Sequence, residues 1–191
     1  MALTTLDPVT ALIVVDLQAG LVGAPFIHPF ADVVARTGAL MTAFRERRLP
    51  IALVNVDGTA PGRTERPRLD AAFPDGWTDL IPELARQASD IVVTKRTWGA
   101  FASTDLEKQL RARGVTHVVI AGVATGTGVE STARQAYEAG FNVTLATDAM
   151  TDARPHAHAY SIEHVFPRLG ETGSTQAIID LLERTNAHEL A

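Results

Sequence analysis

Short runs of consecutive apolar residues recur along this 191-residue chain, each about the length of a β-strand. They occupy residues 11–15, 51–54, 91–93 and 117–120, and a fifth run covers residues 142–146. The apolar residues in the first four runs do not alternate with polar ones, which indicates that both faces of each strand are buried. Strands of this kind predict a parallel sheet enclosed between two layers of helices.

Helical patterns fill the intervals between these runs. Amphipathic helices are expected over residues 30–48, 129–139 and about 174–184. Thr104 and Glu107 have the spacing of a capping box at the start of a further helix, and Gly114 is placed to end it.

This alternation of strands and helices predicts an α/β fold, a three-layer α/β/α sandwich around a mostly parallel, Rossmann-like central sheet. Residues 1–191 are expected to form a single domain, because no linker divides the chain. Residues 56–78 are rich in Gly, Pro and Arg, and we expect them to form a long loop over one edge of the sheet.

The composition excludes several classes of function. A formal net charge of −5 gives no reason to expect nucleic acid or an anionic membrane as a partner. No apolar run has the length of a membrane span and the first residues lack a signal-peptide pattern, so a cytoplasmic protein is expected. The chain contains no cysteine, which rules out disulfides, thiolate metal ligands and thiol nucleophiles.

Polar residues follow the ends of the predicted strands. Ligands of parallel α/β sheets bind beyond the carboxyl ends of the strands, which singles out Asp16, Asn55, Lys95, residues 122–128 and Asp148. A carboxylate set against apolar strands has a raised pKa and can act as a general acid or base, and the alternative for Asp16 is a loop cap. Lys95 would supply a cation near that carboxylate, although taken alone it fits a surface lysine.

The Gly- and Thr-rich segment from Gly122 to Gly128 joins a predicted strand to a predicted helix. Backbone N–H groups at such a helix start can hold an anion or a developing oxyanion, and the alternative is a tight turn without a ligand. The glycines do not have the spacing of a dinucleotide-binding fingerprint, and no phosphate-loop lysine follows them. Nucleotide binding is therefore not expected, and we expect no cofactor.

Other residues near the strand ends are candidates for contacts with a small-molecule substrate. Gln18 could orient substrate or water, and His28, on the loop after the first strand, could face either a ligand or solvent. Trp98 and Phe101 follow Lys95 and are expected to be partly core and partly pocket wall. No metal site is expected, because residues 55–58, which follow the second strand, contain no histidine.

Three segments, in this order, resemble the isochorismatase-like (cysteine hydrolase) superfamily. They are LIVVDLQ at residues 12–18, TKRTWGAF at residues 94–101 and GVATGTGVESTAR at residues 122–134. The resemblance covers nearly the whole chain and implies a hydrolase with a catalytic aspartate at Asp16 and a catalytic lysine at Lys95.

The same resemblance implies further features of the site. It implies a cis peptide bond between Val123 and Ala124, and an oxyanion hole formed by the backbone N–H groups of Ala124 and residue 128. Thr125 matches a threonine of the superfamily that makes hydrogen bonds within the turn. Many relatives are dimers or tetramers, so a homo-oligomer is expected.

The chain departs from most of the superfamily at position 128. Most members carry a cysteine there, which attacks amides and forms a covalent acyl-enzyme, whereas this chain has Gly128. The isochorismatases also carry glycine. For them the resemblance implies that the aspartate protonates the methylene carbon of a vinyl ether and that water captures the oxocarbenium ion.

The resemblance therefore implies a hydrolase without the cysteine nucleophile, in which Asp16 is a general acid toward a vinyl ether or related bond of a small molecule. Thr125-Gly126 replaces the Ala-His pair of known isochorismatases, which points to a substrate other than isochorismate. Two alternatives stay open: a non-catalytic ligand-binding or assembly homologue, and an amidohydrolase whose cysteine was replaced by Gly128.

Overall fold

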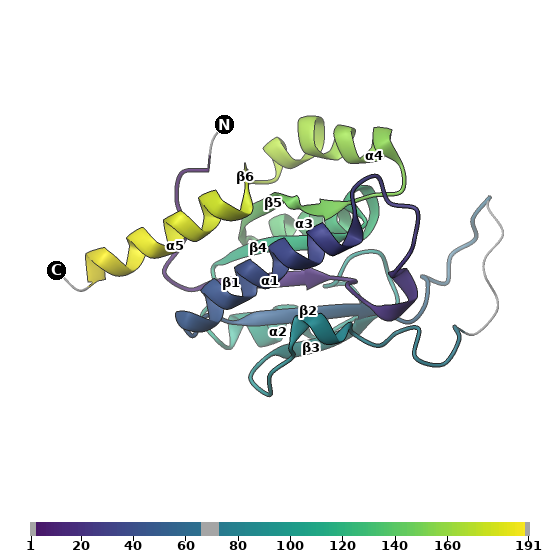
Figure 1. The fold of residues 1–191 in the computed structure, drawn as a ribbon, viewed down its shortest axis with the longest axis horizontal. Coiled ribbons are helices and arrows are strands. Elements are labelled where there is room, and N and C mark those ends of the chain that lie inside the picture. Colours follow the sequence, from purple (N-terminus) through teal and green to yellow (C-terminus); the bar gives the residue numbers. More distant parts are fainter. Residues whose placement is uncertain (1–2, 66–72, 190–191) are drawn as a thin grey trace.

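A parallel β-sheet forms the middle layer of the protein (Figure 1). The computed structural model describes residues 3–65 and 73–189, and in these residues the sheet has six strands in the order β3-β2-β1-β4-β5-β6. The strands are β1 (Thr10–Val15), β2 (Ile51–Val56), β3 (Ile91–Lys95), β4 (His117–Val123), β5 (Asn142–Thr151) and β6 (Glu171–Gly173). Every neighbouring pair runs parallel, which confirms the predicted sheet.

The first five strands correspond to the five apolar runs of the sequence, and β6 is a strand that the sequence does not predict. β6 has only three residues, Glu-Thr-Gly, so it carries no apolar run. β5 also differs from the prediction, because it continues to Thr151 instead of ending near residue 146. A register shift against β4, between Ile120 and Gly122, accompanies this extension through the polar Thr147 and Asp148.

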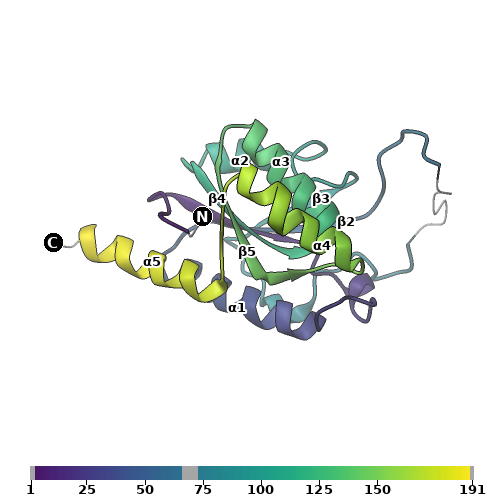
Figure 2. The same ribbon diagram turned by 90° about the horizontal axis from the view of Figure 1, so that it is seen from above.

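Helices cover both faces of the sheet (Figure 2). One face carries α1 (Phe30–Glu46) and α5 (Thr175–Glu189), and the other carries α2 (Leu106–Arg111), α3 (Glu130–Glu138) and α4 (Pro155–Tyr160). The short helical turns are η1 (Ala19–Leu21), η2 (Pro82–Leu84), η3 (Thr125–Val129), η4 (Ser161–Val165) and η5 (Phe166–Arg168).

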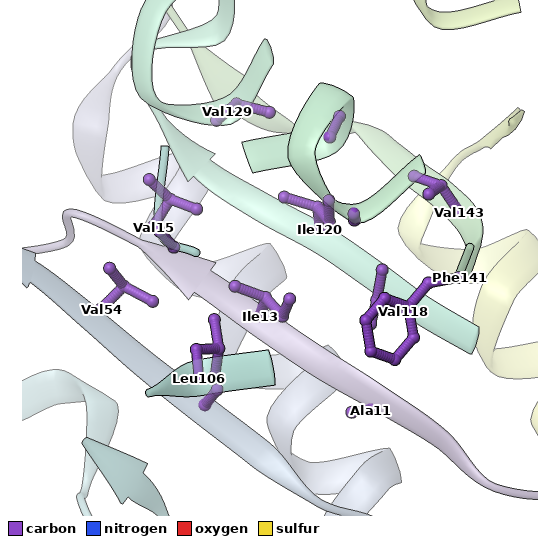
Figure 3. Packing of buried hydrophobic residues seen from close by; sticks show 14 of the residues in the cluster. Ala11, Ile13, Val15, Val54, Leu106, Val118, Ile120, Val129, Phe141 and Val143 are labelled. Carbon is purple, nitrogen blue, oxygen red and sulfur yellow. The ribbon is translucent and has the colours of Figure 1, made fainter. Parts of the chain in front are cut away.

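Alternate residues of β1 enter two separate cores, one on each face. Leu12 and Val14 pack in the cluster that includes α1 and α5. Ile13 and Val15 pack in the opposite cluster with residues of α2 and α3 (Figure 3). Each large side chain buried in this way contributes about 1.5–3 kcal/mol, so β1 stabilises both layers at once. The predicted three-layer sandwich is confirmed.

The ends of α2 and α3 lie close to those that the sequence predicts, whereas α5 continues to Glu189, five residues past its expected end. Thr104 accepts a hydrogen bond from the backbone N–H of Leu106 (3.1 Å), although α2 begins two residues later than the expected cap. Gly114 and Gly140 follow α2 and α3 with φ values of +71° and +79°, a region that favours glycine and ends a helix. Of the long loop expected at residues 56–78, residues 66–72 lie outside the described part of the chain.

The strand order places a topological switch point at the carboxyl ends of β1 and β4. From β1 the chain proceeds outward to β2 and β3, and then returns to the other side of β1 to form β4, β5 and β6. Ligands of open α/β sheets bind where the order reverses in this way. Asp16 follows β1 and the Gly-rich turn follows β4, so both lie at this switch point. Within the described residues, no helix has the length and apolarity needed to cross a membrane.

Candidate active site

Asp16 and Lys95 form a buried ion pair at the carboxyl edge of the sheet. Asp16 comes directly after β1, and Lys95 is the last residue of β3, on the far side of β2. The Lys95 Nζ atom lies 2.8 Å from Asp16 Oδ2, and only 2% of the lysine side chain and 8% of the aspartate side chain are exposed. The structure therefore brings together the two residues that the resemblance identifies as catalytic.

The backbone conformation of Asp16 places its carboxylate next to Lys95. Asp16 has φ +54°, in the left-handed region, which costs an L-residue about 1–2 kcal/mol and is best tolerated by Asn and Asp among residues with a side chain. Its backbone N–H donates to the carbonyl of Val54 (2.8 Å), so the turn out of β1 is held by β2.

Burial raises the pKa of the Asp16 carboxyl from 3.8 to about 6, while the charge and the hydrogen bond of Lys95 act in the opposite direction. A carboxyl group with this pKa is half protonated near pH 6 and carries a proton in about a tenth of the molecules at pH 7. The two oxygens of the Asp16 carboxyl group also differ in their hydrogen bonding. Oδ2 accepts from Lys95, whereas Oδ1 is buried and has no hydrogen-bond partner among the described residues. An unpartnered buried oxygen costs about 1–3 kcal/mol, so Oδ1 is the atom through which a bound molecule would be stabilised.

The turn after β4 lies against this carboxylate. The peptide bond between Val123 and Ala124 is cis, as the resemblance implies. Residues Thr125–Val129 then form η3, which leads directly into α3. The carbonyl of Ala124 accepts from the N–H groups of Thr127 and Val129, whereas no hydrogen bond among the described residues uses the Ala124 N–H. This N–H group is therefore available to an oxygen of a ligand.

Gly128 is the residue of the turn that approaches Asp16 most directly. A Cβ atom at this position would lie 3.1 Å from Asp16 Oδ2, from the Val123 carbonyl oxygen and from Val15 Cγ1. Contacts of 3.1 Å are short for a Cβ, so a side chain here would require its neighbours to move by a few tenths of an ångström. The Cβ of a side chain at position 128 would thus lie beside the ion pair.

A second buried carboxylate, Asp152, supports the turn and was not singled out by the sequence. Only 1% of Asp152 is exposed. Its Oδ2 accepts from the N–H of Gly126 (2.8 Å), and its Oδ1 accepts from the N–H and Nε of Arg154 (2.9 and 3.2 Å). Arg154 Nη2 in turn donates to Thr127 Oγ1 (3.0 Å). Asp152 therefore fixes the turn from outside the sheet.

The sequence places Asp148 at the end of the fifth strand and predicts a structural hydrogen bond to the neighbouring segment for it, and the structure shows such hydrogen bonds although the strand continues past it. Asp148 lies within β5, and its Oδ1 accepts from the N–H and hydroxyl of Thr175 (2.7 and 2.9 Å) at the start of α5. The signal that could have identified Asp152 is the continuation of the apolar pattern through Ala149 and Met150, which moves the end of the strand past Asp148.

The structure does not leave the Gln18 side chain free to orient substrate or water, as the sequence suggests. The residue is fully buried, and both ends of its amide are used by backbone groups. Its Nε2 donates to the carbonyls of Val56 and Trp77, and its Oε1 accepts from the N–H of Val56 (2.8 Å). Gln18 therefore ties the end of β2 to the segment before β3, which stabilises the loops around the site.

His28 and Thr125 lie on either side of His158 in α4. Thr125 Oγ1 is 2.8 Å from His158 Nδ1, which agrees with the hydrogen-bonding part that the resemblance implies for this threonine. The rings of His28 and His158 are in edge contact, with their centroids 4.9 Å apart. Burial is the main cause that lowers the pKa of His158, and the nearby His28 lowers it further. These residues are therefore grouped beside the Gly-rich turn.

The two aromatic residues that follow β3, Trp98 and Phe101, lie in different environments. Trp98 is 66% exposed and is not part of the core, contrary to the expectation that it would be partly buried. Phe101 packs against the core on the α2–α3 face, with its ring centroid 5.8 Å from that of Phe141. That Trp98 or Phe101 contacts a substrate directly stays a prediction.

The segment after β2 does not assemble a metal site. Asn55 Nδ2 donates to the Thr78 carbonyl (2.7 Å), and Asp57 forms two hydrogen bonds with Arg96. Within residues 3–65 and 73–189, no three side chains of His, Asp or Glu are grouped closely enough to hold a metal ion.

The fold and the site together define a three-layer α/β protein with an acid–lysine pair and a Gly-rich turn at the switch point of a parallel sheet. The chain belongs to the isochorismatase family of hydrolases, because the model of the isochorismatase domain matches residues 10–177.

Individual relatives agree with this assignment. The chain is 40% identical to YecD of Escherichia coli O157:H7, an uncharacterized isochorismatase family protein, over 182 residues that cover 91% of this chain and 96% of YecD. The solved structure of an isochorismatase family protein from Burkholderia thailandensis has a TM-score of 0.90 and 39% identity, covering 94% of this chain and 98% of that one. The ureidoacrylate amidohydrolase RutB of Variovorax paradoxus is 32% identical over 151 residues, 69% of this chain and 59% of RutB.

Proposed function

We propose that the protein is a hydrolase that uses Asp16 as a general acid on a small molecule with a vinyl ether or a related acid-labile bond. The observation that carries this proposal is the Asp16 carboxyl group, whose pKa is raised to about 6 and whose Oδ1 is buried without a partner. A general acid works best when its pKa lies near the operating pH. Gly128 leaves no thiol for covalent catalysis, and acid catalysis needs none.

In the proposed reaction the proton of Asp16 moves to the methylene carbon of the vinyl ether. The positive charge that develops on the ether carbon and oxygen is then captured by water. The attacking water gives one of its protons back to Asp16, which leaves a neutral hemiketal. As the C–O bond of the hemiketal breaks, its hydroxyl proton moves to the departing ether oxygen, and a ketone and an alcohol are released. Lys95, paired to Oδ2, stabilises the carboxylate that exists between the two proton transfers.

The remaining residues are assigned to binding. The N–H groups of Ala124 and Gly128 would hold an oxygen of the substrate beside the acid, supported by the unused N–H of Ala124. Thr125 would act through its hydrogen bond to His158, which fixes the turn. His28 and Trp98, both exposed, are the side chains able to contact a substrate as it enters.

The test is an assay of pyruvate release from isochorismate and related enol-pyruvyl ethers between pH 5 and pH 9. Because Asp16 must be protonated to act, kcat/KM is expected to be highest below pH 6 and to fall about tenfold per pH unit above it. A profile that instead rises through pH 6 would show that the ionised carboxylate is the active form, and would reject the general-acid assignment.

A second candidate is amide hydrolysis, favoured by the similarity to RutB, which is named as a ureidoacrylate amidohydrolase. In this case the chain would be an amidohydrolase in which Gly128 stands where the nucleophile would be. Position 128 adjoins Asp16 Oδ2, so a cysteine placed there would have a base within reach.

Gly128→Cys tests this second candidate. If the rest of the site is that of an amidohydrolase, the variant is expected to release ammonia from ureidoacrylate, with a rate that rises as Asp16 ionises. The introduced thiol is the only one in the chain, so its loss on alkylation should remove the gained activity. Gly126→Cys, two residues away on the same turn, is the matched control. A folded Gly128→Cys protein with no ammonia release above wild type would reject this candidate.

A further inference from the structure

A basic groove lies at the edge of the sheet opposite the catalytic residues. The groove has a volume of about 630 Å³ and is lined at the amino ends of β1, β2 and β3, by residues that include Val9, Ile51 and Asp90. Asp90 directly precedes β3, and Lys95 is the last residue of that strand. Five residues of strand span about 16 Å, so the groove is separate from the candidate active site.

The residues that line the groove have a positive net charge, whereas the net charge of the whole chain is negative. Arg45, Arg48 and Arg113 line it, and Asp90 is the only acidic residue that does so in the described part of the chain. The formal charge of these groups is +2, three positive charges and one negative, in a chain whose net charge is −5. Two of these arginines come from the end of α1 and its first following residues, and the third follows α2, so two parts of the chain bring positive charge to one cavity.

Arg45 is fixed in place but is not fully satisfied. Its Nη2 donates to Asp90 Oδ2 (2.9 Å) and to the carbonyl of Leu84 (3.4 Å). Its Nε atom is buried and has no hydrogen-bond partner among the described residues. A buried donor of this kind is stabilised when an acceptor enters the cavity.

Arg48 occupies a position where its backbone is strained. It lies just beyond the end of α1 with φ +55°, a conformation in which glycine is favoured and a long side chain is not. Its side chain is exposed, and no ion pair or hydrogen bond among the described residues involves its guanidinium group. Arg113, which also lines the groove, makes one side-chain hydrogen bond to the described residues, from Nη1 to the carbonyl of Gln109 (2.9 Å). Both guanidinium groups therefore have free donors.

We propose that this groove binds the phosphate group of a small molecule. Guanidinium groups bind phosphate through paired N–H donors, and a dianion matches the formal charge of +2. The volume of the groove leaves room for more than the phosphate itself. The shared chemistry is a phosphate dianion, which free inorganic phosphate or a phosphate monoester would supply.

Titration with inorganic phosphate and with glycerol 3-phosphate tests the proposal, with potassium chloride at matched ionic strength as the reference. Amide resonances of Ser89 and Asp90 are expected to shift and to saturate with both phosphates and not with chloride. Tighter binding of glycerol 3-phosphate would identify an organic phosphate as the ligand, and tighter binding of inorganic phosphate would identify free phosphate.

Arg48→Gln combined with Arg113→Gln is expected to weaken binding about tenfold or more, because each guanidinium contributes charged hydrogen bonds. Arg168→Gln, an exposed arginine outside the groove, is the matched control and should bind as wild type does. Shifts that fail to saturate, equal shifts with chloride, or unchanged binding in the double variant would each overturn the proposal.

Arg48→Gly separates binding from folding. Glycine fits the left-handed backbone at this position, so the variant should raise the Tm by about 2–4 °C while weakening phosphate binding. If Arg48 served the fold alone, the Tm would fall and phosphate binding by the folded protein would be unchanged.

Discussion

Replacing Asp16 by asparagine is expected to lower kcat/KM for the hydrolysed substrate by about 10²–10⁴-fold. This is the usual contribution of a positioned general acid, equivalent to about 3–5 kcal/mol in the activation free energy. Asparagine keeps the shape of the side chain and an oxygen for the 2.8 Å contact with Lys95 Nζ, but it has no proton to deliver to carbon. The measurement is steady-state pyruvate release per folded molecule, with folding checked by near-ultraviolet circular dichroism.

The pH dependence of the same variant gives a second readout that partial unfolding would not reproduce. The fall in kcat/KM above pH 6 belongs to Asp16, so residual activity in Asp16→Asn should no longer show it. Asp57→Asn is the matched control, because Asp57 is also paired with a basic residue beyond a strand end but is partly exposed. Its activity should stay near that of wild type. Activity in Asp16→Asn equal to that of Asp57→Asn would contradict the proposed mechanism.

The layers of the fold could be predicted because the pattern of buried strands is local in the sequence. The run at residues 11–15 is apolar throughout because Leu12 and Ile13 enter cores on opposite faces of the sheet. β6 could not be predicted, because its three polar and glycine residues owe their strand geometry to pairing with Thr144, Leu145 and Ala146 of β5. That pairing is a property of the assembled sheet.

The pair Asp16–Lys95 could be predicted for a related reason. Asp16 directly follows one apolar run and Lys95 lies two residues after another, and parallel strands bring their carboxyl ends to one edge. Asp152 was missed because its position depends on the register shift between β4 and β5. The part played by Gln18 depends on the path of the long loop, which brings the Trp77 carbonyl to its amide. Neither the register nor the loop path is encoded in a short motif.

Loss of the cation from the buried ion pair is expected to destabilise the fold strongly and in a pH-dependent way. Lys95→Met keeps most of the side-chain volume but leaves the Asp16 carboxylate buried without its partner, which costs about 3–5 kcal/mol when the carboxylate is ionised. Arg96→Met removes the cation of the exposed pair with Asp57, and it is the matched control in which little change in stability is expected.

The sign of the pH dependence follows from the direction of the pKa shift. Burial raises the pKa of Asp16 above its ordinary value of 3.8, and Lys95 opposes this rise, so the pKa rises further in Lys95→Met. Between pH 4 and this raised pKa the folded variant binds more protons than the unfolded chain, so its free energy of unfolding falls as the pH increases through that range. Below pH 4 the carboxyl is neutral in both states, and the penalty disappears.

Denaturant unfolding at pH 4.5 and pH 8 should therefore show Lys95→Met close to wild type at the lower pH and far less stable at the higher one. Adding Asp16→Asn removes the unpaired charge, so the double variant is expected to recover the loss at pH 8. Replacement of a whole buried pair by well-packed hydrophobic residues of similar volume is often neutral or stabilising by about 1–4 kcal/mol, and the double variant likewise leaves no buried charge unpaired. Equal destabilisation of Lys95→Met at both pH values would mean that packing, and not the buried charge of Asp16, accounts for the effect. A double variant that is stable but inactive would indicate that the pair is held for catalysis, whereas a double variant no more stable at pH 8 than Lys95→Met would contradict the role given to the buried charge of Asp16.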